Sequence, residues 1–216
     1  MSEWFAKLPS VHWYTWLIIM ILMSVFFALT TSGQKTNWNS RRIAYAAMSI
    51  AIAFILSYVR IWRMPQGGSV TLVSSLPIIA FAVAAGPWQG LVVGFAYGML
   101  QLIQDLFVVH PLQVLLDYPL AYGALALGAF ALLIPMPKYW QLPAAILIGS
   151  IGRYAMSVLS GVVFFSSYAE GSGHTPLVYS LIYNSVILVD GAICIGVALI
   201  PGMSRIVNIL RHSQDR

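Results

Sequence analysis

Long apolar runs separated by short polar segments dominate the pattern of this chain. A helix needs about 20 apolar residues to cross the hydrocarbon core of a bilayer. Seven runs approach or reach that length: Trp13–Thr30, Ile43–Trp62, Val70–Ala85, Trp88–Val109, Leu112–Ile134, Leu142–Phe165 and Val178–Ile200. The third run is short and contains Pro77, which predicts a kinked or tilted helix there. The pattern therefore predicts an all-α, polytopic membrane protein with about seven spans.

The composition strengthens this assignment. Of the 216 residues, 60% are hydrophobic and only 8% are charged, and the mean hydropathy is +0.84. A soluble domain carries about 25% charged residues, so water is not the solvent for most of this surface. The net charge of +5 does not indicate nucleic-acid binding, because the basic residues lie between the apolar runs, as loop charges do in membrane proteins. The single cysteine, Cys194, excludes an internal disulfide and is interpreted as a small packing residue.

The basic residues also predict an orientation. They gather after the first run, between the fifth and sixth runs, and after the last run: Lys35, Arg41, Arg42, Lys138, Arg205, Arg211 and Arg216. If these regions are cytoplasmic, the C-terminus is inside the cell, and the outer loops are Arg60–Ser69, Gln104–Pro111 and Ser166–Leu177. Arg60 and Arg63 then fall on the outer side, against the rule. The first run is longer than the core of a signal peptide, which favours an additional anchor helix.

The first candidate for a ligand contact is Asp117. An Asp at the centre of a spanning helix costs roughly 2.5 to 3.5 kcal/mol, so a retained carboxylate usually faces a protein interior or a cavity. With a rise of about 1.5 Å per residue, Asp117 lies roughly 9 Å deep from the outer side, Asn184 roughly 10 Å and Ser157 roughly 14 Å. Tyr179 and Tyr183 lie level with Asn184 or shallower. An acid, an amide, two phenols and a hydroxyl are therefore expected in one outer layer of the membrane.

A second pair of polar residues lies deeper. Arg153 and Asp190 are each roughly 20 Å from the outer ends of consecutive antiparallel helices. Because either charge alone is costly there, the sequence predicts an intramembrane ion pair with a mainly structural role. Asp117 and Asp190 together raise the alternative of an intramembrane acid–base enzyme. This alternative is disfavoured, because the two carboxylates are expected roughly 10 Å apart in depth and Asp190 has a predicted partner.

Several ordered segments indicate a family. They are Met64-Pro65-Gln66-Gly67-Gly68-Ser69-Val70-Thr71-Leu72, Gly94-Phe95-Ala96-Tyr97-Gly98-Met99-Leu100-Gln101-Leu102, His110-Pro111-Leu112-Gln113-Val114-Leu115-Leu116-Asp117-Tyr118-Pro119-Leu120, Ser160-Gly161-Val162-Val163-Phe164-Phe165 and Tyr179-Ser180-Leu181-Ile182-Tyr183-Asn184. In this order and spacing they resemble the thiamine-specific substrate-binding (S) components of energy-coupling factor (ECF) transporters, from about Arg42 to Ile200. The resemblance implies six helices with a vitamin site near the outer surface, closed by the first outer loop.

The resemblance also implies how such a protein works. It implies a prokaryotic plasma membrane, no catalysis, and neither a cofactor nor a metal in this chain. A separate transmembrane coupling subunit and two cytoplasmic ATPases would drive uptake, which agrees with the absence of a G-x-x-x-x-G-K-[ST] motif from the sequence. Residues 1–40 would form the extra N-terminal helix and its linker, and residues 41–216 the six-helix domain.

Site residues follow from the same resemblance. Asp117 and Tyr118 match the family's carboxylate–tyrosine pair, and Tyr179 and Asn184 match a tyrosine and an asparagine five residues apart. Tyr183 joins this set, Trp62 is the candidate lid aromatic, and Ser157 stands where the family has a histidine. This change extends the expected ligands from thiamine to a thiamine precursor or analogue.

The remaining expectations concern partners and alternatives. Ala47 and Ala51 lie four residues apart on one helix face, where small residues let helices approach closely, and the resemblance implies contact with the coupling subunit. Ordinary packing inside the monomer is the competing interpretation. An S component for a different vitamin, or a stand-alone secondary transporter of a small cationic solute, stays open as an alternative function.

Overall fold

The computed structural model describes residues 38–65, 68–104 and 106–214, together with Met20, Ser24 and Ala28. The predicted first span, Trp13–Thr30, lies outside the described residues except for these three. The helices are α3 (Ser40–Ser57), α4 (Leu76–Ala85), α5 (Pro87–Gln104), α6 (Pro111–Leu115), α7 (Ala121–Gly123), α8 (Lys138–Phe164), α9 (Ser166–Ala169), α10 (Pro176–Asn184), α11 (Val186–Ala198) and α12 (Met203–Gln214), and the strands are β1 (Arg60–Arg63) and β2 (Ser69–Thr71).

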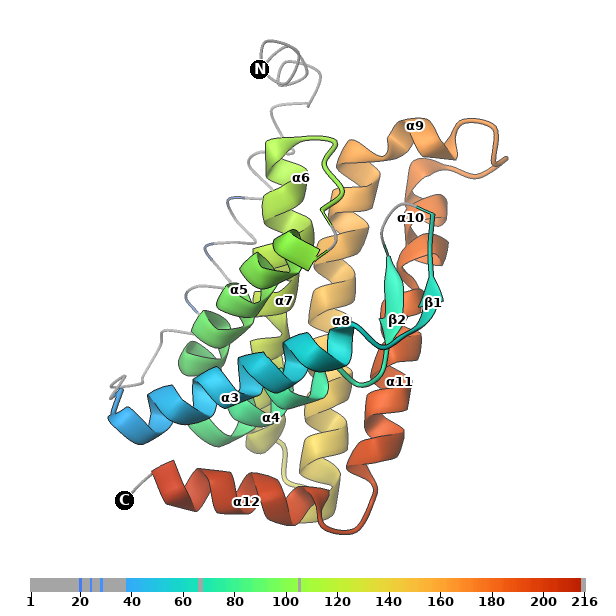
Figure 1. The fold of residues 1–216 in the computed structure, drawn as a ribbon. Coiled ribbons are helices and arrows are strands. Elements are labelled where there is room, and N and C mark those ends of the chain that lie inside the picture. Colours follow the sequence, from blue (N-terminus) through green and yellow to red (C-terminus); the bar gives the residue numbers. More distant parts are fainter. Residues whose placement is uncertain are drawn as a thin grey trace.

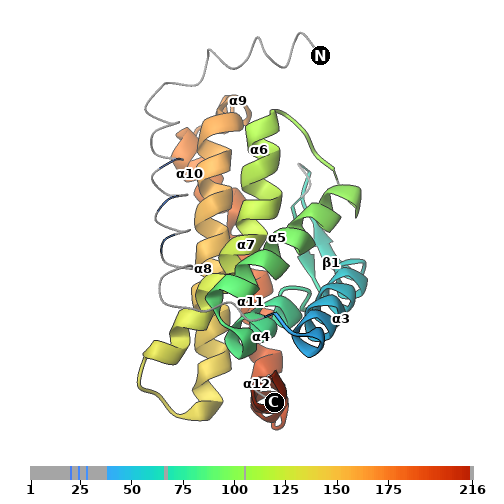
Figure 2. The same cartoon turned by 90° about the vertical axis from the view of Figure 1, so that its left-hand side faces the viewer.

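The helical segment Pro111–Leu133, α8 and the pair α10–α11 run side by side along the molecule (Figure 1). In Figures 1 and 2, α8 lies between the segment that begins at α6 and the pair α10–α11. Among the described residues, four segments are long and apolar enough to cross a membrane: Ser40–Ser57, Pro111–Leu133, Lys138–Phe164 and Pro176–Ala198. The 27 residues of α8 extend about 40 Å, which exceeds the roughly 30 Å of a hydrocarbon core. The chain is a multi-pass membrane protein.

A β-hairpin interrupts the predicted helical pattern. The run Ile43–Trp62 was expected to be helical throughout, but α3 ends at Ser57 and β1 pairs antiparallel with β2. The hairpin residues are rich in β-branched and aromatic side chains, which favour strands. The third run consequently contributes only the ten residues of α4 to the bundle. Pro77 does not kink this helix, because it lies in the first turn, where the missing N–H is not needed.

The segment from Pro111 to Leu133 is continuous but not a regular α-helix. It passes from α6 through a π-helical turn at Leu116–Leu120 and α7 into a 3-10 helix at Ala124–Leu133. Pro119 lies inside the π-helical turn, where its lack of an N–H disturbs regular α-helical hydrogen bonding. This turn carries Asp117, so the irregular backbone determines where the carboxylate points.

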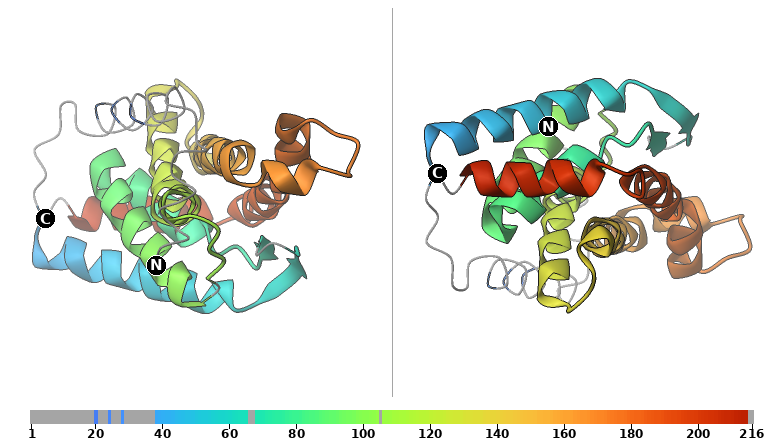
Figure 3. Two further views of the ribbon diagram at one scale, coloured as in Figure 1. Left: turned by 90° about the horizontal axis from the view of Figure 1, so that it is seen from above. Right: turned by 90° about the horizontal axis from the view of Figure 1, so that it is seen from below.

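The core lies where α4, α5 and the 3-10 helix meet α8. Ile78, Phe81, Tyr97 and Leu125 are among its fully buried side chains, and Cys194 packs there as predicted. None of the seven predicted spans includes α12. This helix lies across the end of the bundle opposite α9 and buries Val207 in the same core (Figure 3).

Candidate ligand-binding site

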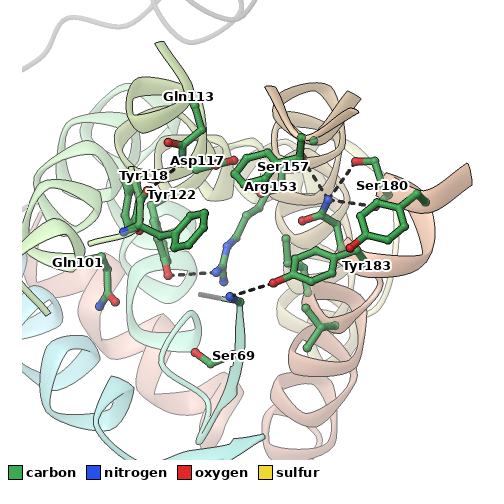
Figure 4. A pocket seen from close by; sticks show the side chains of 18 of the residues that line it. Ser69, Gln101, Gln113, Asp117, Tyr118, Tyr122, Arg153, Ser157, Ser180 and Tyr183 are labelled. Atoms are coloured by element: carbon green, nitrogen blue, oxygen red, sulfur yellow. Dashed lines mark hydrogen bonds between the residues drawn. The ribbon is translucent and has the colours of Figure 1, made fainter. Parts of the chain in front are cut away.

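One cavity gathers most of the residues that the sequence singled out. It lies between the hairpin, α5, the segment containing the π-helical turn, α8, and the pair α10–α11 (Figure 4). Six of the seven predicted ligand-binding residues line it: Asp117, Tyr118, Ser157, Tyr179, Tyr183 and Asn184. The common depth inferred from helix rise thus corresponds to one enclosed space, and their contact with a ligand stays a prediction.

Asp117 and Tyr118 form one side of the cavity, and hydrogen bonds fix both. Gln113 Nε2 donates to Asp117 Oδ2 at 2.7 Å, while Gln113 Oε1 accepts from the Val109 N–H at 3.0 Å. The Tyr118 hydroxyl accepts from the Phe107 N–H at 3.0 Å. The segment before α6 is therefore tied to the π-helical turn, which holds the carboxylate in place with one oxygen hydrogen-bonded to a neutral amide.

Asn184 and the two tyrosines form the opposite side. Asn184 Nδ2 donates to the Ser157 carbonyl at 3.2 Å and to the Ser180 carbonyl at 3.0 Å. With the amide in this orientation, its Oδ1 is the end suited to accept a hydrogen bond from a ligand. The rings of Tyr179 and Tyr183 stack at a centroid distance of 6.2 Å. This wall offers aromatic faces beside one polar acceptor.

The hairpin closes the cavity on a third side. Gly68 and Ser69 line it, and the Gly68 N–H donates to the Tyr183 hydroxyl at 3.4 Å. This long bond joins the hairpin to the aromatic wall. Arg60, at the start of β1, also lines the cavity and is only partly exposed.

The prediction for Trp62 is not supported by its position. Its side chain is 66% exposed and lies in a separate shallow groove with Tyr58, Arg60, Arg63 and Gln104, not in the cavity. Strand pairing shifts register between Arg60 and Trp62. Because such an irregularity breaks the alternation of side chains, Trp62 does not share the inward face of Arg60.

The predicted ion pair between Arg153 and Asp190 stays a prediction, and the structure links the two side chains through a third residue. The hydroxyl of Ser75 hydrogen-bonds to both side chains. Arg153 Nη1 donates to Ser75 Oγ at 3.3 Å, and Ser75 Oγ donates to Asp190 Oδ2 at 3.1 Å. The sequence count gave both charges a similar depth, but it did not include α4, whose N-cap residue Ser75 lies between them.

Arg153 is also a cavity residue, a position that the sequence did not indicate. Its Nη2 donates to the Tyr122 hydroxyl at 3.0 Å, and its Cζ lies 4.2 Å from the centroid of that ring. Figure 4 shows the guanidinium between the acidic side and the aromatic wall. The cation is therefore held against an aromatic face at the centre of the site.

Other lining residues were not identified from the sequence. Gln113 could have been found, because it precedes Asp117 by four residues and therefore shares its helix face. Gln101, Tyr122 and Arg60 gave no comparable signal, since their inward direction depends on how α5, α7 and the hairpin pack. In the part of the chain that the structure describes, no three His, Cys, Asp or Glu side chains gather to hold a metal ion. The lining of the cavity can therefore interact with a ligand through charges, aromatic faces and amide hydrogen bonds.

Comparisons with known proteins agree with this arrangement. Residues 43–209 match the model of the thiamine transporter protein (Thia_YuaJ) family. The chain is 36% identical to thiamine transporter ThiT of Bacillus subtilis over 170 residues, which cover 73% of this chain and 88% of that protein. It is 29% identical to thiamine transporter ThiT of Lacticaseibacillus paracasei over 159 residues, which cover 66% of this chain and 76% of that protein.

A solved structure shares the fold. The match to ThiT from Listeria monocytogenes has a TM-score of 0.58 and 23% identity, and it covers 82% of this chain and 98% of that one. The polytopic S-component fold expected from the sequence is confirmed by this match.

Proposed function

The chain belongs to the thiamine transporter protein family, and from this premise we propose that its cavity binds thiamine, or a close precursor or analogue, as the S component of an ATP-driven importer. The observation that carries the proposal is that Asp117 and Asn184 line one cavity together with several tyrosine rings. Figure 4 shows Asp117 across this cavity from Tyr183 and Ser180. Thiamine has a permanently cationic thiazolium ring at one end and an aminopyrimidine at the other.

The two sides of the cavity suit the two rings. A carboxylate inside the membrane offsets the thiazolium charge, and aromatic faces attract a cation by roughly 0.5 to 2 kcal/mol. The Oδ1 atom of Asn184 accepts a hydrogen bond from the exocyclic amine of the pyrimidine. Ser157 presents a small hydroxyl to the same cavity, which can hydrogen-bond to thiamine or to a precursor or analogue.

The proposal assigns the rest of the transport cycle to partners. This chain binds and does not catalyse, and a transmembrane coupling subunit with two cytoplasmic ATPases supplies the energy. The cavity faces the outside of a prokaryotic plasma membrane, and the C-terminus is cytoplasmic. The proposal assigns the S-component domain to residues 41–216, and the additional spanning helix predicted within residues 1–40 lies almost entirely outside the described residues.

Calorimetric titration of the detergent-purified protein tests this function. The ligands are thiamine, its hydroxymethyl-pyrimidine half and its thiazole half. Saturable binding of one thiamine at submicromolar concentration, tighter than either half alone, is expected. A well-folded sample that binds none of the three contradicts the proposal. Preference for the pyrimidine half identifies a precursor as the ligand.

Tyr183→Phe is expected to speed release of the ligand. The substitution removes the acceptor for the Gly68 N–H and leaves the ring in place. One such hydrogen bond is worth about 1 kcal/mol, so we expect roughly a fivefold rise in the dissociation rate with little change in association. Stopped-flow displacement of bound thiamine measures both rates.

Tyr154→Phe is the matched control for this experiment. Its hydroxyl donates to the Leu181 carbonyl at 3.0 Å, outside the cavity. An equal effect of the two substitutions on release would show that loss of any nearby hydroxyl suffices and that the hairpin contact has no role.

Ala51→Trp is expected to abolish uptake and spare ligand binding. Ala47 and Ala51 are exposed on α3, whereas Ala46 and Ala53 on its other side are buried in the core. A bulky ring at Ala51 therefore points away from the described part of the monomer but blocks close approach of a partner helix. Uptake of labelled thiamine in cells with the complete transporter is expected to fall to background, with the dissociation constant within about twofold of the original.

Leu147→Trp supplies the control, because Leu147 is 51% exposed on α8, away from this face. Uptake should persist in that variant. Normal uptake by Ala51→Trp, or loss of its thiamine binding, would remove the coupling role from this face.

A further inference from the structure

The charges around the cavity pose a problem for a cationic ligand. Among the described lining residues, Asp117 is the acid, and Arg60 and Arg153 are the bases. Arg60 also lines the outer groove, whereas Figure 4 shows Arg153 at the centre of the cavity. A guanidinium inside the membrane would repel a thiazolium across the short distances of such a site, because the effective dielectric constant there is low.

Asp190 lies on α11, one helical turn beyond residues that line the cavity, and does not line it itself. Val186 and Ile187 of α11 line the wall, and Asp190 follows within one helical turn on the same side. The carboxylate is only 2% exposed. It and the Arg153 guanidinium each have an atom within 3.3 Å of Ser75 Oγ.

The carboxylate is also held in position by the hairpin. Asp190 Oδ1 accepts from the Thr71 N–H at 3.0 Å and from the Thr71 hydroxyl at 2.9 Å. With the bond from Ser75, both oxygens are engaged by neutral donors, one of which, the Ser75 hydroxyl, also accepts from Arg153. These donors solvate the charge without neutralising it, so its field still acts on Arg153 and on the space above.

We infer that Asp190 is a specificity-determining residue that balances Arg153 and thereby lets the cavity accept a cation. With Asp117 and Asp190 against Arg60 and Arg153, the four charges cancel. Without Asp190, the net charge around the ligand is positive. With Asp190 present, Arg153 keeps its place against the Tyr122 ring and does not exclude the thiazolium. This inference rests on the proposed function, and it assigns to Asp190 a selectivity role that a purely structural bridge would not have.

The test compares a cationic and a neutral ligand in the same variant. Asp190→Asn keeps the size of the side chain and removes its charge. The dissociation constants for thiamine and for the neutral hydroxymethyl-pyrimidine half are measured by calorimetry. We expect thiamine to weaken about tenfold more than the pyrimidine half. Arg153→Gln, which leaves Asp190 in excess, is expected to shift the ratio of the two constants in the opposite direction.

Two further variants separate charge from structure. Thr71→Val removes one hydrogen bond to Asp190 but keeps the carboxylate, so the ratio should stay within about twofold of the original. The double variant Arg153→Gln/Asp190→Asn carries neither charge and should restore the ratio even if Asp190→Asn alone folds poorly.

Equal weakening of both ligands in Asp190→Asn, or an altered ratio in the double variant, would overturn the inference alone. An original protein that binds no thiamine would overturn the proposed function and the inference with it.

Discussion

Asp117→Asn is expected to weaken thiamine binding by about a hundredfold. The substitution preserves shape but removes the carboxylate that faces the cavity, and the thiazolium would then enter a site whose remaining lining charges are positive. Truncating one partner of a buried charge pair costs about 2 to 5 kcal/mol, and each 1.4 kcal/mol is about tenfold in affinity. Gln113, whose Nε2 lies 2.7 Å from Asp117 Oδ2, can still bond the amide oxygen, so the fold should persist. Calorimetry with thiamine measures the loss.

Glu170→Gln is the matched control for this charge change. Glu170 is an exposed acid in the connection between α9 and α10, and it does not line the cavity. Its removal alters the net charge of the protein equally and should leave the affinity unchanged. A change below about threefold in Asp117→Asn would show that the acid does not neutralise the ligand, since the loss of even one charged hydrogen bond exceeds that.

Gly98→Ala is expected to destabilise the protein and damage the site together. A Cβ atom there would lie 2.5 Å from the Tyr118 carbonyl oxygen and 2.7 Å from Pro119 Cα. Both atoms belong to the backbone of the π-helical turn, which cannot move aside as a flexible side chain can. Overpacking of this kind costs about 1 to 3 kcal/mol, which corresponds to a fall of roughly 3 to 10 °C in the melting temperature.

Because the π-helical turn carries Asp117, weaker thiamine binding should accompany the lower melting temperature. Gly196→Ala is the control, since Gly196 lies in α11 with nothing within 4 Å of an added Cβ. Alanine favours a helix over glycine by about 1 kcal/mol, so this variant should melt at the same or a higher temperature. A Gly98→Ala protein with the original melting temperature and the original affinity for thiamine would show that α5 does not pack tightly against the π-helical turn.

The sequence predicted the membrane class and much of the cavity for a simple physical reason. Helix rise converts position into depth, so Asp117, Ser157 and Asn184 could be assigned to one layer without knowing how their helices face. The cost of a buried carboxylate then made Asp117 the residue to follow. The family match and the shared fold support the predicted class, and the cavity shows that the helices do converge.

What the sequence missed depended on local geometry and on third elements. The apolar run ending at Trp62 has the hydropathy of a spanning helix, yet its last residues pair with β2, and hydropathy alone cannot separate these outcomes. Depth counting brought Arg153 and Asp190 together but could not show that Ser75 lies between them. The inward direction of Arg153 likewise depends on its contact with Tyr122.

An experimental structure of the protein with thiamine tests the proposed binding mode most directly. We expect one thiamine in the cavity, with the thiazolium beside the Asp117 carboxylate and the exocyclic amine of the pyrimidine at Asn184 Oδ1. Arg153 should remain against Tyr122, as it is in Figure 4. Thiamine seated instead in the outer groove beside Trp62 and Arg63, or an empty cavity at saturating thiamine, would contradict this binding mode.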